Sequence, residues 1–168
     1  MSEFFAIVDE NDNVIGKATR KECHSNRNLI HRSVYVFVVN SDNEVFLQKR
    51  SMSKDLYPGF FTASATGHVD YGEDYDAAAK RELKEELGID APLFRLVKVS
   101  SFTENEREIS MLYMCRFDGL IRFNQKEIAE GGFFSVDEIE SSLRNGEKQF
   151  ADGFRIAFTE FLNFTKMH

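Results

Sequence analysis

The sequence of 168 residues contains no tryptophan, two prolines, two cysteines and four histidines. Its two cysteines, Cys23 and Cys115, are too few for a disulfide framework, which excludes the disulfide-rich secreted class. No apolar run approaches the ~18 residues of a membrane-spanning helix, and the first residues lack the basic flank and apolar stretch of a secretory signal. We therefore expect a cytoplasmic protein that does not enter a membrane.

Basic side chains are also in short supply. The chain has 21 Lys and Arg against 28 Asp and Glu, a formal net charge of -7. This balance argues against a general nucleic-acid binder, although divalent ions would let an acidic protein bind phosphates. The surplus is confined to two segments, because residues 67–90 carry a net charge of -5 and residues 104–108 a net charge of -2.

The length and a hydrophobic content of 42% predict one domain over residues 1–168. Runs of strand-forming residues predict strands at 4–8, 13–17, 34–39, 45–48, 60–63, 94–102 and 110–117. Helical periodicity and capping signals predict helices at 74–87, 135–145 and 152–164. In the last of these, Phe154, Phe158 and Phe161 share one face and are expected in the core. The result is a mixed α/β fold with helices flanking a sheet.

Three glutamates share one face of the helix expected at 74–87. Glu82, Glu85 and Glu86 stand at i, i+3 and i+4, a spacing at which like charges cost a few tenths of a kcal/mol per pair. Such a cluster suggests a bound cation, and carboxylate oxygens suit Mg²⁺ or Mn²⁺. Arg81 is expected to pair with Glu73 and hold the preceding loop against the helix. The alternative is an ordinary solvated charged face.

The stretch from Gly67 to Ile89 resembles the Nudix box at every specified position: Gly, five residues, Glu, seven residues, Arg-Glu, an aliphatic residue, one residue, Glu-Glu, one residue, Gly and an aliphatic residue. The resemblance implies a Nudix fold, an α/β/α sandwich with a mixed β-sheet, and cleavage of diphosphate linkages. It implies metal binding by Glu82, Glu85 and Glu86, with Arg81 and Glu73 in the same catalytic motif. The general base is left open among these glutamates and a carboxylate elsewhere. Family members are often dimers, and a homodimer is left open too.

A longer resemblance, over residues 8–116, is to the isopentenyl-diphosphate isomerases, which share the Nudix fold. It is carried by residues 8–16, 49–54 and 57–59 and by the pair His24 and His31. In those enzymes three histidines and two glutamates hold a metal, which implies a second site suited to Mn²⁺, Zn²⁺ or Fe²⁺. The matching residues here are His24, His31, His68, Glu106 and Glu108, with Glu104 and Glu106 as another register. Structural histidines and an exposed strand edge are the alternatives.

The basic residues that match the diphosphate contacts of the isomerases are Arg20, Arg50 and Lys54. Ordinary surface charge is the alternative, most of all for Arg20. Two loops, residues 127–132 and 146–153, are candidates for substrate specificity.

The chain departs from the isomerases at two points. Thr66 stands where they have a catalytic cysteine, and a hydroxyl has too high a pKa to replace a thiol in proton transfer. They also use a tryptophan to stabilise a carbocation, and this sequence has none. A metal-dependent hydrolase acting on a small-molecule diphosphate is therefore favoured. The alternatives are an isomerase with an altered acid–base pair and a non-catalytic module that binds a nucleotide or diphosphate.

Overall fold

The computed structural model describes residues 3–104 and 106–167. Strands and helices follow in the order β1 (Phe4–Val8), β2 (Val14–Thr19), α1 (Arg20–Ser25), β3 (Ile30–Val39), β4 (Val45–Arg50), β5 (Phe61–Thr62), β6 (Ala65–His68), α2 (Tyr75–Leu87), β7 (Phe94–Phe102), β8 (Arg107–Arg116), β9 (Ile128–Phe134), α3 (Val136–Asn145) and α4 (Asp152–Thr165).

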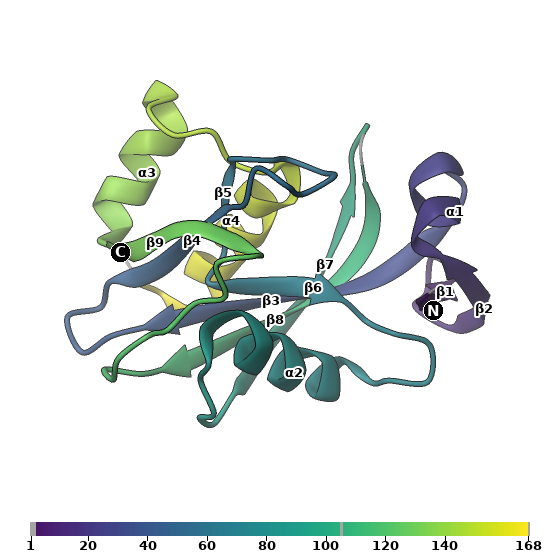
Figure 1. Ribbon diagram of the computed structural model, residues 1–168, viewed down its shortest axis with the longest axis horizontal. Helices are drawn as coiled ribbons and strands as arrows, with labels where there is room; N and C mark the ends of the chain where they lie inside the picture. Colours follow the sequence, from purple (N-terminus) through teal and green to yellow (C-terminus); the bar gives the residue numbers. More distant parts are fainter. Residues whose placement is uncertain (1–2, 105, 168) are drawn as a thin grey trace.

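Across the described residues, the nine strands form one mixed sheet centred on β3 (Figure 1). The β3 strand pairs in parallel with β8 from His31↔Glu108 to Val39↔Arg116, and β7 extends the sheet beyond β8. Antiparallel partners along β3 are β1, β6 and β4. The parallel register brings the first residues of β3 beside the first residues of β8. The predicted ligands His31 and Glu108 lie there as direct partners.

Side chains alternate along β3 and so build two cores. Val34, Val36 and Val38 belong to the core under α2, while Tyr35 and Phe37 belong to the core under α4. Helices α2 and α4 cover opposite faces of the sheet (Figure 1). The predicted mixed α/β/α sandwich is confirmed.

The aromatic stripe of α4 lies in the second core, as predicted. Phe154, Phe158 and Phe161 are all buried, and the ring of Phe161 stacks on that of Phe37 with centroids 4.4 Å apart. Such aromatic packing buries a large apolar area and helps to hold α4 on the sheet.

Several expected boundaries were wrong. The loop expected at 127–132 is largely strand β9, which pairs with β4. Neither α1 nor β6 was predicted, β3 begins at Ile30 rather than at residue 34, and the strand expected at 60–63 is limited to Phe61–Thr62. None of the helices within residues 3–104 and 106–167 has both the length and the apolar character needed to span a membrane.

Candidate functional site

Most of the side chains predicted to carry the chemistry line one cavity of about 370 Å³. It is lined by the acidic residues Glu82, Glu85, Glu86, Glu106, Glu108, Asp70 and Glu127, by the basic residues Arg20, Arg50, Lys54 and Arg81, and by His68 and Thr66, among others. The three box glutamates, the predicted phosphate contacts, and His68, Glu106 and Glu108 of the histidine site thus line one space, whereas His24 and His31 are not among its lining residues. This cavity is the candidate active site.

Helix α2 has clearly defined ends. The Asp74 side chain accepts a hydrogen bond from the Ala77 backbone N–H at 2.7 Å, and the helix stops at Gly88, whose φ of 65° is readily adopted by glycine. Between these ends Glu82, Glu85 and Glu86 keep the helical register that directs them to the cavity.

Arg81 ties the preceding loop to α2. Its Nε and Nη2 each donate to one carboxylate oxygen of Glu73 at 2.9 Å, and Nη2 also donates to the carbonyl of His68 at 3.0 Å. Its Nη1 donates to Oε1 of Glu82 at 2.6 Å. The expected pairing with Glu73 is present, and the same guanidinium also fixes one of the candidate metal ligands.

Glu82 lies directly against strand β6 because Gly67 has no side chain. A Cβ atom on Gly67 would lie 2.2 Å from Cδ of Glu82, so a larger residue would displace the carboxylate. The first glycine of the motif therefore has a steric function, since it lets the helix and the strand approach closely.

Glu86 is buried and accepts two hydrogen bonds on Oε1, from Nε2 of Gln48 at 3.0 Å and from the backbone N–H of Thr66 at 2.9 Å. Glu85 stands at the rim of the cavity with a side-chain exposure of 59%. The three glutamates thus run from the interior of the cavity to its mouth.

The electrostatics of these glutamates fit a cation. Burial raises the pKa of Glu82 to about 7 although Arg81 opposes the shift, and burial together with Glu82 raises the pKa of Glu86 to about 8. Two carboxylates that resist ionisation because they are buried close together are stabilised in their charged form by a divalent ion. An all-oxygen set suits Mg²⁺ or Mn²⁺.

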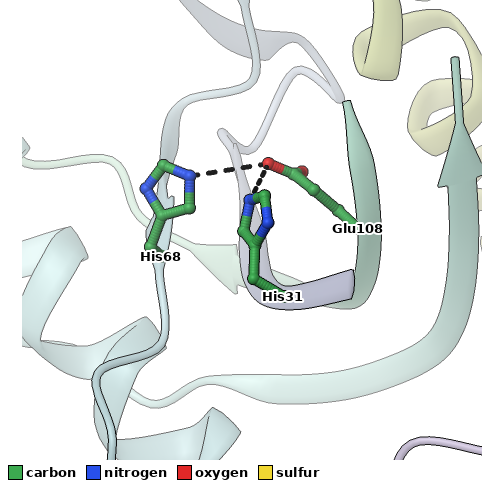
Figure 2. Close-up of side chains that lie close together, drawn as sticks. All are labelled: His31, His68 and Glu108. Carbon is green, nitrogen blue, oxygen red and sulfur yellow. Dashed lines mark hydrogen bonds and ion pairs between the residues drawn. The ribbon is translucent and has the colours of Figure 1, made fainter. Parts of the chain in front are cut away.

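A second group joins three chain segments at the start of the β3–β8 pair. Oε1 of Glu108 lies 3.0 Å from Nε2 of His31 and 3.5 Å from Nε2 of His68, so the carboxylate faces both rings (Figure 2). Ser33 donates to Oε2 of Glu108 at 2.9 Å. Potential ligand atoms of His31, His68 and Glu108 all lie within 4.8 Å of one another, an arrangement able to hold a metal ion.

The pKa values of Glu108 and His68 favour the protonation states in which these side chains bind metal. Although burial alone would raise the pKa of Glu108, hydrogen bonds to His31 and His68 hold it well below its usual range. Burial lowers the pKa of His68 to about 4. An ionised carboxylate beside a neutral imidazole is the protonation state that metal ligation requires.

The two other predicted ligands lie close by. Glu106 lines the cavity, and its Oε2 is buried without a hydrogen-bond partner among the described residues. Burial and the neighbouring Glu108 raise the pKa of Glu106 to about 8. The ring of His24 lies 6.2 Å from that of His68, outside the tight group of three. Glu104, the other register, is exposed.

The predicted phosphate-binding residues all line the cavity but have protein partners. Arg20 donates two hydrogen bonds to Asp55, at 2.9 Å and 2.7 Å, and Nε of Arg50 donates to the carbonyl of Leu56 at 2.9 Å. Lys54 forms an ion pair with Glu127. A phosphate would bind Arg20 or Lys54 in competition with these carboxylates.

Reasoning from sequence missed Asp55, an acidic residue in a segment without a motif, which the fold places beside Arg20. Glu127 begins one of the two candidate specificity loops and lines the cavity beside Lys54. Thr66, noted as a departure, lies in the cavity beside Glu86.

Comparison with known proteins identifies the family of this chain. The family model of the NUDIX domain matches residues 29–154. An isopentenyl-diphosphate Delta-isomerase 2 of Photorhabdus laumondii is 31% identical over 97% of this chain and 92% of its own. An uncharacterised Nudix hydrolase of Nostoc sp. is 32% identical over 96% of this chain and 97% of its own.

Among solved structures, a protein from Deinococcus radiodurans superposes with a TM-score of 0.83 at 26% identity, covering 95% of this chain and 99% of that one. The NUDIX domain of Shewanella oneidensis NrtR, solved with ADP-ribose, has a TM-score of 0.61 at 13% identity over 79% of this chain and 86% of that one, so it shares the fold alone. The chain therefore belongs to the Nudix family, and its relatives include proteins named as isomerases and as hydrolases.

Proposed function

We propose that the protein is a divalent-metal-dependent Nudix hydrolase that cleaves the diphosphate linkage of a nucleoside diphosphate derivative or a related compound. The observation that supports this most is that Glu82, Glu85 and Glu86 line one cavity with Arg20, Arg50 and Lys54. Carboxylates for metal and cations for phosphate are the two donor sets that diphosphate cleavage needs. We place the activity in the cytoplasm.

In this proposal Glu82, Glu85 and Glu86 hold Mg²⁺ or Mn²⁺, which offsets charge on the diphosphate and lowers the pKa of water when bound. Arg81 keeps Glu82 in place through its 2.6 Å contact, while Arg50 and Lys54 neutralise phosphate oxygens. A carboxylate of the cavity takes the proton of the attacking water.

The histidine group is proposed as a second metal site. His31, His68 and Glu108 form its centre, and His24 and Glu106 complete the five-residue set. Imidazole with carboxylate suits Mn²⁺, Zn²⁺ or Fe²⁺.

The second candidate function is isomerisation of isopentenyl diphosphate. It is favoured by the isomerase relatives and by the grouping of His31, His68 and Glu108. It is opposed by Thr66 in the cavity, because an aliphatic hydroxyl lacks the acidity of a thiol. A non-catalytic binding module is the third reading.

Screening the purified protein with Mg²⁺ or Mn²⁺ tests these functions together. Nucleotide sugars, dinucleotides, CoA, nucleoside triphosphates and isopentenyl diphosphate would be followed for phosphate products and for isomer formation. The proposal predicts phosphate release from at least one compound, and loss of that release in Glu85→Gln and Glu86→Gln variants. Full activity in both variants, or cleavage of no compound, would contradict the hydrolase mechanism.

A further inference from the structure

His24 lies beside the carboxylate of Asp55 and near the ring of His68. Its Nδ1 lies 3.8 Å from Oδ2 of Asp55, and its ring lies 6.2 Å from that of His68. Nε2 of His24 is buried and has no hydrogen-bond partner among the described residues. A buried ring nitrogen without a hydrogen-bond partner is uncommon in folded proteins, and a bound ligand would satisfy it.

The position of Asp55 favours Nδ1 as the protonated nitrogen of His24. A carboxylate facing Nδ1 favours the tautomer that carries its proton there, which leaves the lone pair on Nε2. Metal-bound histidines commonly donate their other N–H to a carboxylate, which orients the ring and strengthens the ligand.

Arg20 anchors Asp55 in this place. Arg20 and His24 stand at i and i+4 on α1 and so share one face of that short helix. Nε and Nη2 of Arg20 hold both oxygens of Asp55, which belongs to the loop between β4 and β5. One loop carboxylate therefore contacts both side chains of this face.

We propose that Asp55 is a positioning residue that orients His24 for metal binding beside His31, His68 and Glu108, and that Arg20 holds Asp55 in place. This inference rests on the proposed second metal site. It assigns Arg20 a function in the metal site that does not require a phosphate.

The test measures metal affinity without substrate, so it does not depend on the reaction. The full chain would be stripped with a chelator and titrated with Co²⁺, whose absorption spectrum reports coordination, together with calorimetry. Asp55→Ala is expected to weaken Co²⁺ binding about 10- to 100-fold and to alter the spectrum. Asp55→Asn, which keeps an acceptor oxygen, and Arg20→Ala should cause smaller losses in the same direction.

A double-mutant cycle separates positioning through His24 from a general structural effect. If Asp55 acts through His24, Asp55→Ala added to His24→Ala should cause no further loss of affinity. Asp42→Ala, at an exposed acidic residue of the β3–β4 turn, is the matched control and should bind Co²⁺ as the unaltered chain does.

Two outcomes overturn different claims. If the unaltered chain binds no Co²⁺, or if His31→Ala does not reduce the Co²⁺ that it binds, the second metal site is wrong. The proposed function of Asp55 is then wrong as well. If that site binds Co²⁺ and Asp55→Ala leaves both affinity and spectrum unchanged, or if the losses from Asp55→Ala and His24→Ala add, the site stands and the positioning function of Asp55 is wrong.

Discussion

Nε2 of His31 lies 3.0 Å from Oε1 of Glu108, and the two residues are direct partners in the parallel register of β3 and β8. Both are nearly fully buried. An imidazole and a carboxylate placed together by two central strands have little freedom to rearrange, so their donor atoms are already arranged for a ligand.

Removing this pair should abolish metal binding at the histidine group. His31→Ala combined with Glu108→Gln deletes two of three grouped ligands, so we expect at least a 100-fold loss of Co²⁺ or Mn²⁺ affinity. Metal analysis after dialysis measures this. Glu130→Gln, an exposed change on β9, serves as the control. Undiminished bound metal in the double variant would disprove the site.

The box glutamates should be needed for turnover rather than for folding. Glu86→Gln keeps the size of the side chain and an acceptor oxygen for Gln48 and Thr66 but removes the charge. We expect kcat to fall about 10²- to 10⁴-fold, with thermal unfolding close to that of the unaltered protein. Steady-state kinetics on a substrate found by the screen, again with Glu130→Gln alongside, would settle this. A loss below threefold would rule out an essential part for Glu86.

The metal-free protein should lose stability as the pH rises from about 4.5 to about 8. Burial raises the pKa of Glu82 to about 7 and that of Glu86 to about 8 in the folded state, against 4.5 ordinarily. A carboxyl with a raised folded pKa contributes stability that is complete below pH 4.5 and is lost as pH rises through about 7 to 8.

Urea unfolding in the presence of a chelator, between pH 5 and 9, measures this effect. Because the amide does not titrate, Glu86→Gln should give a shallower fall of unfolding free energy than the unaltered chain over the same range. Equal slopes for the two proteins would show that Glu86 does not titrate as its burial implies.

Asp12 should be important for stability away from the cavity. Its buried carboxylate accepts hydrogen bonds from Arg32 at 2.8 Å, from Lys98 at 2.6 Å and from Tyr75 at 2.9 Å, which ties the β1–β2 turn to three elements. Asp12→Asn tolerates the positive φ of 65° at this position but removes the charge, and should lower the free energy of unfolding by about 2 kcal/mol. Urea denaturation provides the value.

Glu10→Gln is the matched control for Asp12, because Glu10 is an exposed acid in the same turn. It should leave the free energy of unfolding within about 0.5 kcal/mol of the unaltered protein. Equal effects of the two changes would contradict a special role for Asp12.

The sequence predicted the fold best where one local signal dominated. Helix α2 has a cap at Asp74, a stop at Gly88 and strong helix formers between them, and it matches the expected range closely. Residues 127–132 are expected to form a loop but lie largely in strand β9, where a Cβ on Gly131 would lie 2.4 Å from the Phe46 ring. That glycine is required by packing against a neighbouring strand, which no local pattern shows.

The short helix α1 could have been found from sequence. Thr19 followed three residues later by Glu22 is a capping box, and both of its hydrogen bonds form. Without a long periodic stretch behind it, the signal was overlooked.

For the candidate site, the sequence predicted most of the side chains that lie together but not the hydrogen bonds and ion pairs that position them. The partners of Arg20 and Lys54 are Asp55 and Glu127, 35 and 73 positions away, and only tertiary packing brings them together. Tertiary packing also places His24 near His68. The ligand atoms of His24 nevertheless lie outside the group formed by His31, His68 and Glu108.

The most direct test of the account follows one mixture of nucleoside diphosphate derivatives and isopentenyl diphosphate, in D₂O with Mg²⁺ or Mn²⁺, by ³¹P NMR for phosphate products and by mass spectrometry for deuterium. Hydrolysis of a diphosphate linkage yields new phosphate signals, whereas isomerisation incorporates deuterium into an unbroken diphosphate. The account predicts cleavage of at least one nucleoside diphosphate derivative and no deuterium in the isopentenyl compound. Deuterium incorporation without any diphosphate cleavage would contradict it.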